Sequence, residues 1–131
     1  ENVVPGGQQI KAAVRDAVLA VHRNLLETER LAWERMNGRV AGNLEVLRLA
    51  IEDPWFAWLR PLTALIAAMD EAIRDDSPEA ESRAAAILAE TSSLLRPDEN
   101  GSDSQQRYDE FVQRAPDVAV AHGRLMRVLA G

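Results

Sequence analysis

The sequence predicts an all-α protein, a four-helix-bundle-like domain with a long first helix and a central, proline-kinked second helix. Glycine and proline are few, at seven and six residues, and alanine is abundant, a composition that favours helix over strand. Apolar residues recur at steps of three and four through most of the chain, as they do on a helix face. At 131 residues, the chain suits one domain. We expect residues 1–7 to be a flexible leader and residues 8–131 to form one bundle domain.

The first helix is predicted over residues 8–52, which contain no proline. Gly38 and Gly42 would normally indicate a break, but an apolar stripe passes through this region without losing register. A glycine inside a helix costs only about 1 kcal/mol relative to alanine. We therefore predict one continuous or gently bent helix, about 65 Å long, with more apolar length than the other helices can cover. The two stripes of this region are Ile10, Val14, Ala17 and Val21, then Trp33, Met36, Val40, Leu44, Leu47 and Ile51.

The second helix is predicted to begin at Pro54. The carboxylate of Asp53 can cap it, and proline is tolerated at the first helical position because no backbone bond is lost there. We expect this helix to reach about Asp75, with a kink at Pro61 or a short first segment that ends near Leu59. Apolar residues cover more than one of its sides, so the other helices are expected to enclose it.

Two further helical regions complete the predicted bundle. The third helix follows a cap-then-proline signal at 77–78 and ends before Pro97. The last region begins at Ser102, which has capping-box spacing to Gln105. Pro116 is expected to kink or restart this last helix.

Composition excludes several function classes. The chain has no cysteine, so disulfides and thiolate chemistry are excluded, and a reducing cytoplasm is the expected location. The net charge is −6 and there is no basic stripe, so we expect no nucleic-acid partner and no membrane partner. The longest run without charge or proline, residues 62–69, is far shorter than the roughly 20 residues of a membrane span. Fourteen arginines against one lysine indicate a GC-rich bacterial source.

No catalytic, metal-binding or cofactor-binding residue is assigned. Metal-binding helices place a histidine three or four residues from a carboxylate or another histidine. Every such position around His22 and His122 is apolar. Carboxylates that are adjacent in the sequence are explained as helix caps or as charges favoured by helix dipoles. Asp70 is the only one of them that lies beside an apolar stripe.

The sequence leaves two hypotheses for function. The first is a non-enzymatic protein–protein interaction or self-association module, most simply a homodimer that covers the excess apolar length of the first helix. Its candidate interface residues are Trp33, Met36, Gly38, Val40 and Gly42. The alternative is a small-molecule-binding protein or enzyme with a pocket between helices. Its candidate pocket residues are Trp55, Trp58, Arg60 and Asp70, which offer aromatic surfaces and charge.

Overall fold

The computed structural model describes residues 10–131, which form six α-helices and one 3-10 helix without a strand. The all-α prediction is confirmed for this part of the chain. The leader predicted for residues 1–7 lies outside the described residues. In chain order the elements are α1 (Ala12–Asn37), α2 (Asn43–Glu52), η1 (Pro54–Leu59), α3 (Arg60–Ile73), α4 (Ala80–Leu94), α5 (Asp103–Arg114) and α6 (Pro116–Ala130).

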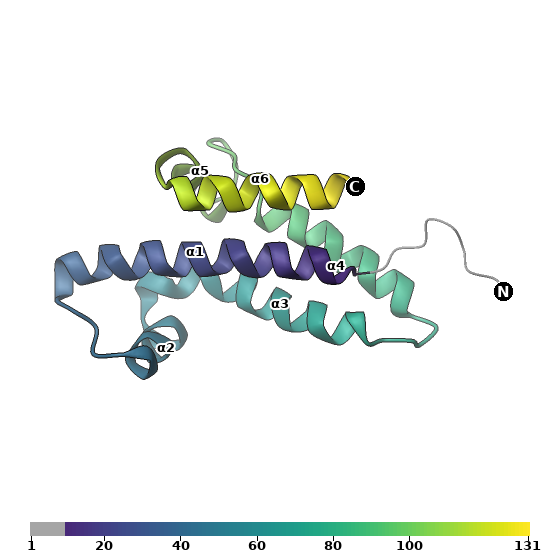
Figure 1. Ribbon diagram of the computed structural model, residues 1–131, viewed down its shortest axis with the longest axis horizontal. Helices are drawn as coiled ribbons and strands as arrows, with labels where there is room; N and C mark the ends of the chain where they lie inside the picture. Colours follow the sequence, from purple (N-terminus) through teal and green to yellow (C-terminus); the bar gives the residue numbers. More distant parts are fainter. Residues whose placement is uncertain (1–9) are drawn as a thin grey trace.

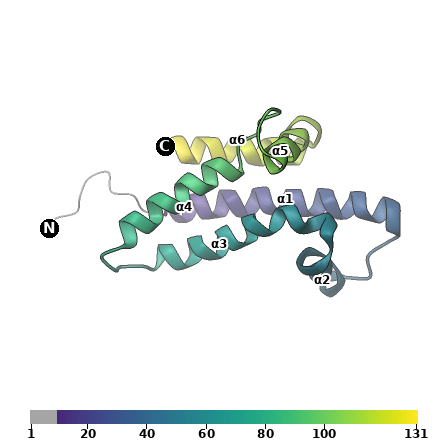
Figure 2. The same cartoon turned by 180° about the vertical axis from the view of Figure 1, so that it is seen from behind.

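Helix α1 is the central element of the bundle. It packs against α6 along one side and against η1 and α3 along another (Figure 1). Seen from behind, α4 rises diagonally from the end of α3 towards α5 and α6 (Figure 2). The prediction that the segment 54–73 occupies the centre is therefore wrong. That segment has no extensive contact with α6, whereas α1 packs against α6 and also against η1 and α3.

The core lies where α1 meets these neighbours. Its residues come from every helix, so each element contributes apolar surface to one continuous interior. Phe56, Met69, Tyr108 and Leu125 are among its largest fully buried side chains. Among residues 10–131, no helix is both long enough and apolar enough to cross a membrane.

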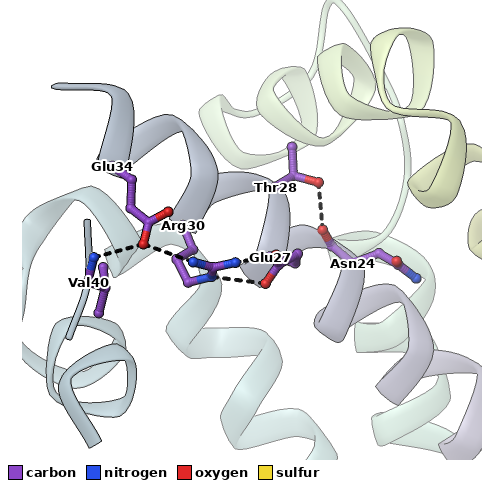
Figure 3. Close-up of polar contacts among 6 residues, drawn as sticks. All are labelled: Asn24, Glu27, Thr28, Arg30, Glu34 and Val40. Carbon is purple, nitrogen blue, oxygen red and sulfur yellow. Dashed lines mark hydrogen bonds and ion pairs between the residues drawn. The ribbon is translucent and has the colours of Figure 1, made fainter. Parts of the chain in front are cut away.

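The predicted continuous helix over residues 8–52 is broken at Gly38. Gly38 and Gly42 have φ angles of +92° and +155°, in the left-handed region that other residues avoid. Between them the chain reverses direction. Glu34 fixes this link, because its carboxylate accepts the backbone N–H of Val40 at 2.8 Å and pairs with Arg30 at 2.9 Å (Figure 3). This local hydrogen bond stabilises the turn, although the apolar stripe keeps helical register through residue 38.

The other helix boundaries follow the sequence closely. Asp53 accepts the backbone N–H of Trp55 at 2.9 Å, and the predicted short first segment is the 3-10 helix η1. Ser102 and Gln105 form both bonds of the capping box. The chain restarts at Pro116 as α6. The cap predicted at residue 77 is absent, since α4 begins at Ala80 with no side-chain cap.

Candidate functional site

An open groove lies between α1, α2 and α3, and we call it the association groove. Its volume is about 570 Å³ and most of its surface is apolar. Helix α1 forms one wall, α2 a second, and α3 with the end of η1 a third. The lining residues are His22, Leu26, Asn43, Val46, Leu47, Ala50, Ile51, Leu59, Arg60, Thr63, Ala64 and Ala67.

The α2 wall exposes large apolar side chains. Leu47 and Ile51 are 56% and 60% exposed, and Leu44, one turn earlier, is 84% exposed. These three residues stand at positions i, i+3 and i+7, so they form one stripe along the helix. Only Leu49 of α2 is buried against the rest of the molecule. Helix α2 therefore presents an apolar stripe that no described part of this chain covers.

The opposite wall, on α3, is built from small side chains. Thr63, Ala64 and Ala67 line it, and all three are exposed. Small residues allow the backbone of another helix to approach closely. The groove thus combines a wall of large apolar side chains with a wall of small ones.

Polar groups in the groove come from Arg60, His22 and Thr63. Arg60 donates from Nε to the carbonyl of Ala50 at 3.1 Å and from Nη2 to the carbonyl of Asp53 at 2.8 Å. No carboxylate of residues 10–131 forms an ion pair with Arg60, so its charge is not neutralised there. His22 Nε2 lies 2.9 Å from Thr63 Oγ1, and burial lowers the pKa of His22.

The predicted interface residues gather at the α1–α2 end of the molecule. Trp33 is half-buried and lines a shallow pocket with Asp53 and Pro54, so the reversal returns the end of α1 to the start of η1. Met36 is 69% exposed. Gly38, Val40 and Gly42 belong to the link between the helices. The two glycines therefore lie outside any helix and share no helix face.

The four predicted pocket residues do not share one pocket. Asp70 accepts a hydrogen bond from Arg15 at 2.8 Å, on the far half of α3. Arg60 lies in the association groove. Trp55 and Trp58 lie together at a different place, where Trp55 Nε1 donates to the backbone carbonyl of Glu29 and Trp58 Nε1 donates to its carboxylate.

Glu29 is fully buried, and sequence reasoning missed it. Its Oε2 accepts hydrogen bonds from Trp58 Nε1 at 2.6 Å and from Arg107 Nε and Nη2 at 3.1 and 2.7 Å. The Arg107 guanidinium carbon lies 5.5 to 5.8 Å from the ring centres of Trp55, Trp58 and Phe111. We call these five residues the Glu29 cluster. Glu29 follows Leu25 by four residues in the buried stripe of α1. A charged residue at a position of an apolar stripe is a feature by which Glu29 could have been recognised in the sequence.

The two histidines have separate environments. His122 Nδ1 lies 2.7 Å from the hydroxyl of the buried Tyr108, and burial lowers the pKa of His122. Burial raises the pKa of Tyr108, so its hydroxyl stays protonated. In residues 10–131, no three histidine or carboxylate side chains stand close enough together to hold a metal ion.

Comparisons of the chain with protein-family models, with curated proteins and with solved structures found no match.

Proposed function

We propose that the protein is a self-association module, and that two copies form a two-fold dimer through the association groove and α2. The observation that carries this proposal is the uncovered stripe of Leu44, Leu47 and Ile51 beside an open apolar groove on the same face. Contiguous exposed apolar surface of this kind marks sites of association.

A two-fold arrangement matches the positions of the stripe and the groove. In a two-fold interface the same surface patch is used by both copies. Because α2 is itself one wall of the groove, an axis beside α2 places each α2 in the groove of the other copy. Both stripes and both grooves then become buried in one event. The small side chains of Ala64 and Ala67 leave room for the incoming helix.

The charges of α2 and of the groove are complementary. Glu45 and Glu52 lie near the two ends of α2, and Arg48 between them forms an ion pair with each. Arg60 brings a cation without an ion-pair partner among the described residues into the groove. A glutamate from the α2 of the second copy would supply the missing opposite charge, and such pairing fixes the orientation of an interface.

Sedimentation of a groove variant tests this proposal. The wild type is expected to sediment at twice 14.5 kDa at high concentration and to dissociate on dilution. Leu47→Asp places a charge in the stripe and is expected to remain a monomer over about 10 to 200 µM. Val120→Asp is the matched control, since Val120 is 72% exposed on α6 and does not line the groove. A wild type that stays at 14.5 kDa across this range, or equal effects of both variants, would contradict the proposal.

A small amphipathic acid is the second candidate occupant of the groove. The positive charge of Arg60 stands at an apolar pocket whose volume, about 570 Å³, is typical of small-molecule sites. Decanoate is a suitable probe of this alternative. Saturable decanoate binding by the dilute wild type, lost in Arg60→Gln, would favour a ligand-binding function over self-association.

A further inference from the structure

The Glu29 cluster has the composition of a receptor for a planar cation. Three aromatic rings, from Trp55, Trp58 and Phe111, surround the Arg107 guanidinium, which pairs with the fully buried carboxylate of Glu29. Trp58 and Phe111 stack on each other at 5.7 Å with an angle of 9° between their planes. Aromatic faces attract cations, and arginine more often than lysine occupies such positions. The guanidinium of Arg107 occupies the cluster in this structure.

Arg107 leaves half of the carboxylate without a partner. Its Nε and Nη2 both donate to Oε2 of Glu29, and Trp58 donates to the same oxygen. Oε1 is buried and has no hydrogen-bond partner. A guanidinium usually binds a carboxylate with two parallel bonds, one to each oxygen. The attachment of Arg107 to α5 restricts it to a geometry in which one acceptor remains unsatisfied.

The site also has a route to solvent. The side chain of Arg107 is 38% exposed, whereas Glu29 beneath it is 0% exposed. The carboxylate is therefore reached through the position that Arg107 fills. We expect a guanidinium without this attachment to turn so that it donates to both oxygens while it keeps the three aromatic contacts.

We propose that Glu29, Trp55, Trp58 and Phe111 form a guanidinium-binding site that the chain's own Arg107 fills in the absence of a ligand. Its ligands are guanidines, either small molecules or the arginine side chain of a partner. The site is separate from the association groove, and its ligand binding does not depend on dimer formation. In the wild type the ligand competes with a tethered group at high effective concentration, so Arg107→Ala is the sensitive form for measurement.

The test is a titration of Arg107→Ala with methylguanidinium up to about 20 mM, far below denaturing concentrations. The expected result is a saturable shift of the Trp58 indole N–H resonance. The thermal midpoint should rise by about 5 °C at twenty times the dissociation constant. Methylammonium, a point charge without the planar fork, is expected to bind at least about tenfold more weakly. A tripeptide with a central arginine, compared with its lysine counterpart, shows whether a side chain on a partner chain can enter the site.

The controls separate a specific site from general effects of the cation. Arg107→Ala combined with Glu29→Gln keeps the cavity but removes the carboxylate charge, and is expected to lose the response. Should Arg107→Ala fail to fold, Arg107→Met retains the apolar stem and replaces it in the same titration. An equal response in the Glu29→Gln combination, an equal response to methylammonium, or no response in a folded Arg107 variant would overturn the proposal.

Discussion

Glu29 occupies a position in the apolar stripe of α1 where a hydrophobic residue is expected. Val14, Val18, Val21 and Leu25 precede it at helical steps, and all four are buried. A buried carboxylate is tolerated only when donors compensate its lost hydration. Trp58 and Arg107 supply these donors from positions 29 and 78 residues away. A local sequence pattern cannot show contacts over such separations along the chain. The sequence therefore predicted that the tryptophans lie in the core or in a pocket, and not that one of them binds a carboxylate.

The two histidines are expected to make the free energy of unfolding depend on pH. Burial lowers the pKa of both His22 and His122 below the ordinary value of 6.5. Below that value the unfolded chain binds protons more readily than the folded chain, so stability falls as pH decreases. We expect the free energy of unfolding to decrease from about pH 7.5 to pH 5.5, and this loss to be smaller in His22→Gln and His122→Gln. Urea unfolding at both pH values measures it. A loss of the same size in the double variant would contradict the assignment to histidine.

At the scale of elements, the link between α1 and α2 decides which surface the protein presents. The stripe from Trp33 to Ile51 keeps helical register in the sequence, yet the chain turns back at Gly38. The bond from the Val40 N–H to Glu34 and the positive φ angles of Gly38 and Gly42 stabilise the turn. As a result, α2 forms a wall of the association groove instead of extending α1.

Replacing Gly38, which lies outside the helices, and replacing Gly123, which lies within α6, by alanine are predicted to have opposite effects on the free energy of unfolding. Gly38→Ala puts a side chain at φ +92° and is expected to lower the free energy of unfolding by about 1 to 2 kcal/mol. Gly123→Ala lies within α6, where the new Cβ would meet only Arg127 Nη1 at 3.7 Å. It is expected to raise that free energy by about 0.5 to 1 kcal/mol. Urea unfolding compares the two variants. A stabilising Gly38→Ala would show that the helix can run through residue 38.

At the scale of the whole molecule, the bundle has enough helices to enclose α1 but not α2. Helix α6 packs along one side of α1 and the pair η1 and α3 along another, while α4 packs against α3 and α5 (Figures 1 and 2). Helix α2 contacts mainly η1 and retains exposed leucines. A second copy of the chain would bury this face, which is the basis of the proposed dimer.

A dimer predicts that thermal stability depends on protein concentration. Binding of a second copy to the folded state adds stability that increases with concentration. We expect the thermal midpoint of the wild type to rise by about 3 °C for each tenfold increase in concentration. In Leu47→Asp the midpoint should be independent of concentration. Calorimetric scans of both proteins at several concentrations measure this difference, and an invariant wild-type midpoint would argue for a monomer.

Local sequence signals predict the helices and most of their ends. Asp53, Ser102 and Pro116 act within one turn of their own position, so their effects on helix boundaries are visible in the local pattern. The central position of α1 and the meeting of Trp58 and Arg107 at Glu29 became visible only in three dimensions. These features depend on contacts between residues far apart in the chain, where burial and hydrogen bonding outweigh local helix propensity.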